Sequence, residues 1–247
     1  MINYQYGDFT IYGLDNQLLP ANAWSTKRDY FKVITAMTRQ SAMAKQKIFQ
    51  CSQHAVASCA ALIKTGGVVI YPTDTIYGIG CDPYNDSAVK RIFTIKGRDE
   101  KKPLPILTSS IGEAEKIVSL GRTGRMLAEK YWPGALTIVA PIIDYRISPR
   151  VIAGSSSLAV RVPANNCVLL LLRHCIYLVG TSANLSGERT MKSAQEVLNS
   201  GLEGYDALLD GGTVERGVES TIVSVEGKPK ILREGAIKSR EILHLIG

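Results

Sequence analysis

Zinc sites, membrane spans and secretory signals each leave a pattern that this sequence does not contain. Its five cysteines form no Cys-x-x-Cys pair and its three histidines lie far apart in the chain, so we expect no structural zinc site. The longest apolar run, residues 167–172, holds six residues, whereas a membrane-spanning helix needs about 20. The first residues include neither a basic nor an apolar segment of the secretory type. We therefore expect a cytoplasmic protein whose cysteines are reduced thiols, with no contact to a membrane.

The chain also lacks the glycine-rich loops that mark many nucleotide sites. Neither G-x-x-x-x-G-K-[ST] nor G-x-G-x-x-G occurs, which excludes Walker and Rossmann phosphate loops. The histidines His54, His174 and His244 fall on expected helices or near the N-terminal segment, away from the ends of strands. A histidine-based nucleophilic mechanism is therefore not indicated.

The overall composition is that of a globular protein. Among 247 residues, 45% are hydrophobic and 21% are charged, which argues against a disordered, collagenous or disulfide-scaffold chain. There are 29 basic and 22 acidic side chains, giving a net charge of +7. This excess favours anionic partners such as nucleotide phosphates or RNA, and it does not choose between them.

Residues 1–50 differ from the rest of the sequence. They contain no clean strand run, and a basic, polar stretch follows a break at Pro20. The apolar spacing allows a helix from Thr26 to Phe49, which could be a surface arm or an RNA-contacting basic helix. We divide the chain into an N-terminal appendage of unassigned role, 1–50, and a folded domain, 51–247.

Strands and helices alternate after residue 50. Strands are predicted at 67–71, 104–107, 136–140, 158–162, 177–180, 207–209, 221–225 and 230–232. Helices are predicted from Asp86 to a stop at Gly97, and at 122–131, 165–174, 193–199 and 239–245. This order indicates an α/β fold with a large twisted sheet flanked by helices. The short turn at Glu226-Gly227 requires antiparallel neighbours, so we expect a mixed sheet.

Polar clusters follow several of these elements. Thr73, Asp74 and Thr75 come directly after a buried strand, where ligands gather in open α/β sheets. The same three residues could instead form an ordinary Asx or Ser/Thr turn. Ser182 and Asn184 follow another strand, and at a spacing of two they would point the same way in an extended chain. A helix cap or a polar loop is the alternative for that pair.

Two further features concern positive charge. Lys96, Arg98, Lys101 and Lys102 lie within seven residues at a helix C-terminus. They could simply offset the helix dipole, yet their mutual repulsion favours an anionic ligand, which Arg98 could contact with both arms of its guanidinium. Arg161 interrupts an apolar strand, so it needs either an acidic partner or an anionic ligand.

Seven motifs occur in a fixed order across about residues 54–237: Tyr-Pro-Thr-Asp-Thr-x-Tyr-Gly, Lys-Gly-Arg, Trp-Pro-Gly-x-Leu-Thr, Arg-Val-Pro, Ser-Ala-Asn-x-Ser-Gly, Gly-Val-Glu-Ser-Thr and Leu-Arg-x-Gly. In these motifs the sequence resembles the YrdC family, the threonylcarbamoyl-AMP synthases, in its single-domain form. The resemblance implies a YrdC-like twisted α/β sheet. It also implies a nucleotidyltransferase that condenses L-threonine, bicarbonate and ATP into threonylcarbamoyl-AMP and releases pyrophosphate.

The resemblance also implies partners and a cofactor. The product supplies the N6-threonylcarbamoyl group of an adenosine beside the tRNA anticodon, so tRNA and the proteins of that modification pathway are expected partners. Mg²⁺ is expected to accompany ATP, bound through phosphates and water rather than by a dedicated protein site. The attack on the α-phosphorus needs fixed cations and amide donors, and it needs no protein nucleophile.

Site residues carry over by position. The resemblance assigns catalysis to the Lys-x-Arg and Ser-x-Asn tetrad, Lys96, Arg98, Ser182 and Asn184. It assigns L-threonine binding to Thr75, Arg161, Ser182 and Ser220, with Arg161 facing the carboxylate. It assigns ATP binding to Lys96, Arg98, Lys102, Ser157, Asn184 and Arg233.

The sequence departs from some family members in places. Leu107 and Asn165 stand where some carry His, and Asp99 stands where some carry Pro, which bears on the contacts to threonine and leaves the tetrad intact. A rival interpretation is a non-catalytic paralogue on the same fold that binds RNA or a ribosomal partner. The basic N-terminal segment fits that rival, whereas the intact tetrad favours the enzyme.

Overall fold

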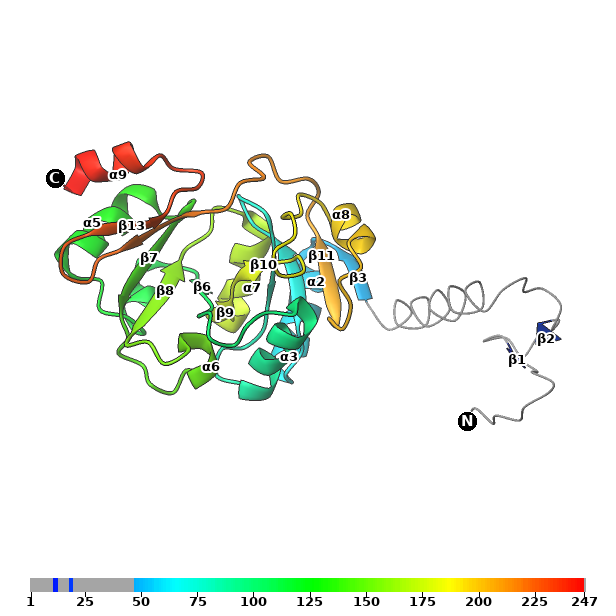
Figure 1. Cartoon of the computed structure of the whole chain (residues 1–247). Coiled ribbons are helices and arrows are strands. Elements are labelled where there is room, and N and C mark those ends of the chain that lie inside the picture. The colour runs from blue at the N-terminus through cyan, green and yellow to red at the C-terminus, as the bar shows by residue number, and fades with distance from the viewer. Residues whose placement is uncertain (1–10, 13–17, 20–46, 247) are drawn as a thin grey trace. The chain divides into compact units, whose positions relative to one another are not determined.

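The computed structural model describes residues 11–12, 18–19 and 47–246. The chain divides into two compact units, Met1–Lys45 and Gln46–Gly247. In the first unit the described residues form an antiparallel pair of two-residue strands, β1 (Ile11–Tyr12) and β2 (Leu18–Leu19). The second unit holds all the motifs described above, and many of its elements are labelled in Figure 1.

The helix expected from Thr26 to Phe49 is only partly within the described residues. Residues 26–46 lie outside them, and at its end the expectation is wrong because Lys47–Gln50 form a strand, β3. This strand pairs in parallel with β11 (Ala207–Asp210) along its whole length. Pairing with a strand that lies far away in the sequence, and not local helical periodicity, sets the conformation of this segment.

The strands of the second unit form two mixed sheets. The five-stranded sheet has the order β10 (Thr181–Ser182), β5 (Tyr77–Gly80), β4 (Val69–Pro72), β11 and β3. The six-stranded sheet has the order β13 (Lys230–Arg233), β12 (Thr221–Ser224), β7 (Leu136–Pro141), β8 (Ser157–Arg161), β6 (Ile106–Thr108) and β9 (Tyr177–Val179). Both sheets combine parallel and antiparallel neighbours, including the antiparallel β12–β13 hairpin. The predicted mixed α/β fold is confirmed, with its strands divided between two sheets.

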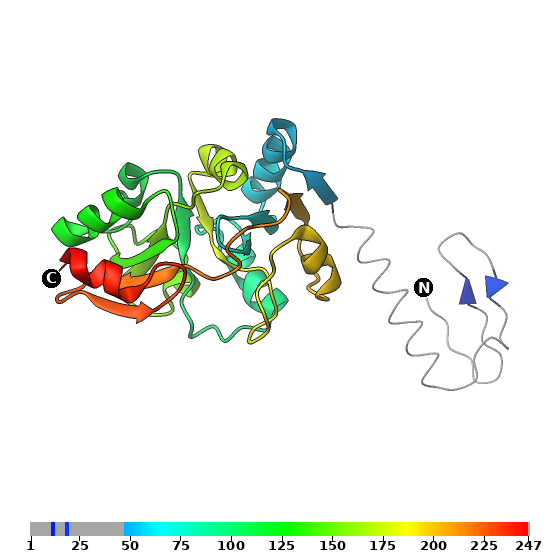
Figure 2. The same ribbon diagram turned by 90° about the horizontal axis from the view of Figure 1, so that it is seen from above.

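Helices flank these sheets (Figures 1 and 2). They are α2 (Gln53–Lys64), α3 (Asp86–Lys96), α4 (Ile111–Ala114), α5 (Gly121–Tyr131), α6 (Pro149–Ile152), α7 (Asn166–Cys175), α8 (Ala194–Asn199) and α9 (Ser239–Ile246). The two ends of helix α3 are both fixed by capping residues that can be recognised in the sequence. The Asn85 side chain accepts a hydrogen bond from the Ala88 amide, and Gly97 ends the helix with a left-handed φ of 57°. Within the described residues no helix is both long and apolar enough to cross a membrane.

The two sheets meet at a close backbone crossing that positions the site. Gly180 carries the chain from β9 in one sheet to β10 in the other. A Cβ atom at Gly180 would lie 2.4 Å from Leu107 Cγ, and one at Gly80 would lie 1.9 Å from the Val179 carbonyl oxygen. Glycine is needed at Gly80 for the two backbones to approach so closely, and at Gly180 to leave room for the Leu107 side chain. Ser182 is thereby brought next to the end of α3.

The core lies on both faces of strand β4. Ile70 packs into the larger apolar cluster, while Val69 and Tyr71 pack into a second cluster beneath α2 and α7. A strand buried on both faces reads as a continuous apolar run, as this one does. Helices α2 and α7 pack side by side over this second cluster (Figure 2).

One expectation about cysteine is wrong. Cys51 and Cys167 form a disulfide, while Cys59, Cys81 and Cys175 are free thiols. Cys51 lies just before α2 and Cys167 lies in the first turn of α7, so the packing of these two helices brings the sulfurs together. Their separation of 116 residues gave no local signal of this pairing in the sequence.

Candidate active site

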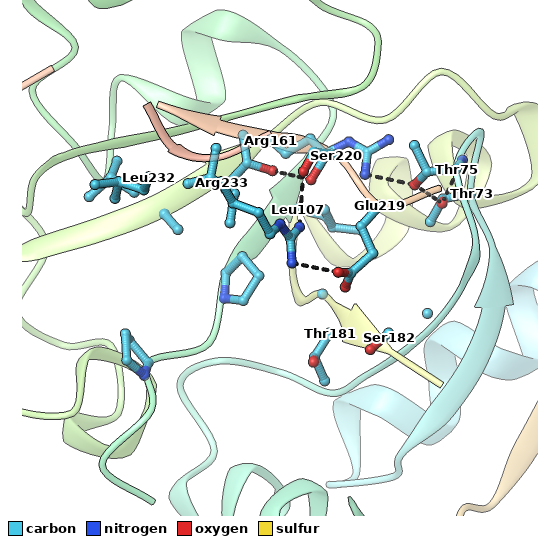
Figure 3. Close-up of a pocket in the computed structure, with 18 of the residues that line it drawn as sticks. Thr73, Thr75, Leu107, Arg161, Thr181, Ser182, Glu219, Ser220, Leu232 and Arg233 are labelled. Carbon is cyan, nitrogen blue, oxygen red and sulfur yellow. Dashed lines mark hydrogen bonds and ion pairs between the residues drawn. The ribbon is translucent and has the colours of Figure 1, made fainter. Parts of the chain in front are cut away.

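A cavity of about 540 Å³ lies between the two sheets, within the range of roughly 300–1,000 Å³ that is typical of small-molecule sites. Its lining comes from the loop after β4, from β7, β8, β10, β12 and β13, and from the segment after α3, as Figure 3 shows in part. The predicted site residues that line it are Thr75, Arg98, Ser157, Arg161, Ser182, Ser220 and Arg233. The predicted residues Lys96, Lys102 and Asn184 are not among the lining residues.

Arg161 and Thr75 form one corner of the cavity (Figure 3). Arg161 Nη1 donates to Thr75 Oγ1 at 3.0 Å, and Arg161 Nε donates to the Gly134 carbonyl at 2.8 Å. Thr73 Oγ1 accepts from the backbone amides of Thr75 at 3.1 Å and Ile76 at 3.2 Å. The turn alternative therefore holds for Thr73, while Thr75 also reaches Arg161.

Asp74 is the acidic partner of Arg161, one of the two possibilities that the sequence left open. Asp74 Oδ1 accepts from Arg161 Nη2 at 2.6 Å and from the Ala164 amide at 2.9 Å. The Arg161 and Asp74 side chains are 7% and 10% exposed. Burial lowers the pKa of Arg161, and the charge of Asp74 opposes that change. Asp74 Oδ2 is buried and makes no hydrogen bond.

Lys96 lies behind the cavity wall. The residue is only 2% exposed, and its Nζ donates to the carbonyl of Asn184 at 2.6 Å and to the carbonyl of Ser182. Burial lowers the pKa of Lys96 to about 8, with Arg98 acting in the same direction and Glu219 opposing. In this arrangement the ammonium group holds the backbone that carries Ser182 and Asn184.

Ser182 and Asn184 do not share one direction. Ser182 lines the cavity, whereas Asn184 is buried, with its Nδ2 donating to the carbonyls of Leu185 and Glu188, both at 2.8 Å. Asn184 Oδ1 is buried without a hydrogen-bond partner. The unused atom of this side chain is therefore an acceptor.

Arg98 and Arg233 bring positive charge to the other end of the cavity. Arg98 Nη2 donates to the Pro103 carbonyl at 3.0 Å. Arg233 Nη1 donates to Glu219 Oε2 at 2.8 Å and its Nη2 donates to the Ser220 carbonyl at 3.0 Å, while its Nε is buried without a partner. Burial lowers the pKa of Arg98, the Glu219 charge opposes this, and Arg233 adds to it. Two guanidinium groups, one of which keeps a buried donor without a partner, suit an anion.

The remaining predicted residues have simpler surroundings. Ser220 Oγ lies 2.8 Å from Thr137 Oγ1 in a buried pair of hydroxyls. Ser157 begins β8 and is buried at the cavity wall. Lys102 is exposed, and its contact with the site is a backbone one, because its carbonyl accepts from Arg98 Nε at 3.4 Å.

Sequence reasoning missed two parts of the cavity. Glu219 contributes a carboxylate, although it stands inside the Gly-Val-Glu-Ser-Thr motif and could have been selected there. The other missed part is an apolar floor from the six-stranded sheet, with Val139, Ile222 and Leu232. Alternation along β12 turns Ile222 toward the cavity and Val223 into the core.

The fold and the site together define an α/β protein whose cavity, between two mixed sheets, combines an apolar floor with arginine side chains. The family profile Sua5_yciO_yrdC, described as telomere recombination, matches residues 61–235. The chain belongs to this family, as the motifs suggested.

Curated relatives agree with this assignment. The chain is 37% identical over 196 residues to a threonylcarbamoyl-AMP synthase of Bacillus subtilis, covering 78% of this chain and 56% of the relative. It is 37% identical over 192 residues to the Pyrococcus abyssi enzyme of the same name, covering 76% and 56%. The chain thus spans little more than half the length of these two relatives.

Solved structures resemble the fold. Pyrococcus abyssi Sua5 in complex with L-threonine matches with a TM-score of 0.76 and 33% identity, covering 82% of this chain and 60% of that one. Escherichia coli YciO matches with a TM-score of 0.73 and 20% identity over 80% of this chain and 99% of that one, which supports the fold alone.

Proposed function

We propose that this protein condenses L-threonine, bicarbonate and ATP into threonylcarbamoyl-AMP and releases pyrophosphate. The observation that carries the proposal is that one cavity joins the Arg161–Thr75 corner to the cationic end formed by Arg98 and Arg233. An amino acid carboxylate and a nucleotide phosphate group need two such anion sites in reach of each other. The names of the curated relatives support this reaction.

L-threonine takes the Arg161 corner in this proposal. A guanidinium has five N–H donors, and Arg161 uses three of them on Gly134, Thr75 and Asp74. The other two remain for a carboxylate, in the charge-assisted contact that arginine makes best. Thr75, Ser182 and Ser220 offer hydroxyls around that position. The structure of Pyrococcus abyssi Sua5 in complex with L-threonine supports the choice of this amino acid as the ligand.

ATP takes the other end. The phosphates lie by Arg98 and Arg233, whose buried Nε lacks a partner, and the base lies on the apolar floor of the six-stranded sheet. Ser157 lies beside that floor. Lys102 contacts ATP in this proposal, because its exposed side chain could reach a phosphate from the rim of the cavity.

The chemistry follows from this placement. An oxygen of N-carboxy-threonine attacks the α-phosphorus, the bond from that phosphorus to the bridging oxygen breaks, and pyrophosphate leaves. Negative charge grows on the phosphate oxygens, and Arg98 stabilises it without reorganisation because its guanidinium is already fixed. Lys96 contributes by holding the backbone of Ser182 and Asn184 in place.

Mg²⁺ is part of the proposal. Among the described residues no group of three His, Cys, Asp or Glu side chains could form a protein cage, so the ion would be held mainly by phosphates and water. Asn184 Oδ1 has no hydrogen-bond partner, but it is buried and lies outside the cavity lining, so we assign it no part in holding the ion. The ion would neutralise phosphate charge at the cationic end. The product would pass to the proteins that modify tRNA, and a cytoplasmic location is part of this proposal.

A substrate-omission assay tests the function. Pyrophosphate release should require L-threonine, bicarbonate and ATP together. Release that does not depend on threonine, or no release from the folded protein, would contradict the proposal, and RNA binding without turnover would favour the non-catalytic paralogue.

A further inference from the structure

Glu219 is a charged side chain in the cavity to which neither the motifs nor the proposed reaction gives a role. Its Oε2 accepts from Arg233 Nη1 at 2.8 Å, and no hydrogen bond within the described structure engages Oε1. The side chain is 37% exposed, and Figure 3 shows its carboxylate directed into the cavity between Arg233 and Ser182. A substrate can therefore reach Oε1.

A second contact places Glu219 beside the proposed threonine corner. The Gly217 amide donates to the Thr75 carbonyl at 2.8 Å, so the segment that carries Glu219 runs alongside the loop after β4. The next residue, Ser220, lines the same corner, with its hydroxyl on Thr137. The carboxylate thus borders both ends of the cavity.

L-threonine enters as a zwitterion, and the assigned residues account for only half of its charge. Arg161 faces a carboxylate, while the ammonium group needs an acceptor, because a charged donor left unpaired in a cavity is costly. Of the described residues that line the cavity, two are acidic. Glu226 is exposed in the turn between β12 and β13, and Asp74 lies behind Arg161 and outside the lining. Glu219 is the carboxylate in position.

We propose that Glu219 Oε1 accepts a hydrogen bond from the α-ammonium group of L-threonine, and that Glu219 is thereby a specificity-determining residue for an amino acid substrate. This inference rests on the proposed function. Arg233 holds the carboxylate through its other oxygen, so the contact forms without breaking the ion pair. The same Oε1 can accept from the remaining N–H once the nitrogen carries the carboxyl group.

The test compares two ligands on two proteins by calorimetric titration of the full chain. The ligands are L-threonine and its 2-hydroxy analogue, in which a hydroxyl replaces the ammonium group. The substitution is Glu219→Gln, which keeps an oxygen for Arg233 and removes the charge. We expect the wild type to bind L-threonine more tightly than the analogue by about tenfold to a hundredfold, as for a hydrogen bond to a charged group. In Glu219→Gln this preference should vanish, while the affinity for ATP stays close to the wild-type value.

Glu215→Gln is the matched control. Glu215 is exposed in the same segment and does not line the cavity, so this variant should keep the preference. Thermal melting of Glu219→Gln should match the wild type, because its ion pair with Arg233 is more than a third exposed and contributes little to stability.

The possible failures are distinguishable. A wild type that binds no L-threonine and releases no pyrophosphate refutes the proposed function and this inference with it. A wild type that performs the reaction, with Glu219→Gln retaining the preference for the ammonium group, refutes this inference alone. Weaker binding of Mg·ATP with unchanged threonine affinity would also refute it, since Glu219 would then face the nucleotide and its cation.

Discussion

The buried pair Asp74–Arg161 gives the sharpest prediction about stability. Replacing Asp74 by Asn keeps the shape of the side chain and an oxygen that can accept from Arg161 and Ala164, and it removes the negative charge. Because the Arg161 side chain is only 7% exposed, its positive charge would then lie in the protein interior without a counter-charge. Removing one partner of such a pair costs about 3–5 kcal/mol of unfolding free energy.

Urea denaturation measures this loss. Asp99→Asn is the control, since the Asp99 side chain is exposed and its carboxylate accepts a local hydrogen bond from the Lys101 amide. Such surface changes cost about 0.5 kcal/mol or less. A double variant, Asp74→Asn with Arg161→Met, should lose less stability than the sum of the two single changes, because no unpaired charge remains.

L-threonine should restore part of the lost stability in Asp74→Asn. Its carboxylate would provide the counter-charge that Asp74 supplied, so the variant should bind threonine more tightly and gain more stability than the wild type at the same threonine concentration. A concentration of one hundred times the dissociation constant contributes about 2.7 kcal/mol. Unfolding of Asp74→Asn within about 1 kcal/mol of the wild type would refute the role of the buried charge. Equal stabilisation of both proteins by threonine would instead refute the placement of the carboxylate at Arg161.

Three further predictions follow from single contacts. Arg98→Ala should lower the rate of pyrophosphate release about a hundredfold with unchanged melting, and Arg98→Lys should recover little of it; near-normal turnover of Arg98→Ala would refute a catalytic role. Folding lowers the pKa of Lys96 from an ordinary 10.5 to about 8, so between these two pH values the unfolded chain binds more protons than the folded protein. The free energy of unfolding of the wild type, relative to Lys96→Met, should therefore rise with pH in this range. Denaturation experiments from pH 7 to 10 would measure this rise. Reducing the Cys51–Cys167 disulfide, which closes a loop of 116 residues, should lower the free energy of unfolding by about 4–5 kcal/mol. Alkylation of the denatured, unreduced protein should label three of the five cysteines, and labelling of all five would contradict the disulfide.

The sequence predicted most strands whose own residues are apolar and β-branched, because such runs fit a buried sheet whatever their partners. It did not predict β5 or β10, which are short and contain glycine or hydroxyl residues. These strands depend on the close crossing at Gly80 and Gly180, which only the folded backbone reveals. Helix α2 was missed although its signal was present, since Ser52 caps it and its buried residues recur at three- and four-residue spacing.

The sequence predicted which types of residue form the candidate site, but it predicted less well which of their side chains point into the cavity. Local spacing could not show that Lys96 turns away from the cavity, because its acceptors, the carbonyls of Ser182 and Asn184, lie more than 80 residues later in the chain. Asp74 was found as part of a polar cluster, but its pairing with Arg161 also depends on a contact between distant segments. Which residues of these distant clusters meet is a property of the tertiary fold.

The three cavity arginines share one feature that links the fold to the proposed chemistry. Each donates to a backbone carbonyl: Arg98 to Pro103, Arg161 to Gly134, and Arg233 to Ser220. Their guanidinium groups are therefore fixed by the main chain before any ligand arrives, and they keep N–H groups for it. Fixed donors need no reorganisation as charge develops, which is the condition under which electrostatic stabilisation of a transition state is most effective. Asp74 pairs with Arg161, and Glu219 pairs with Arg233. These carboxylates reduce the electrostatic repulsion among the three arginines when no ligand is bound.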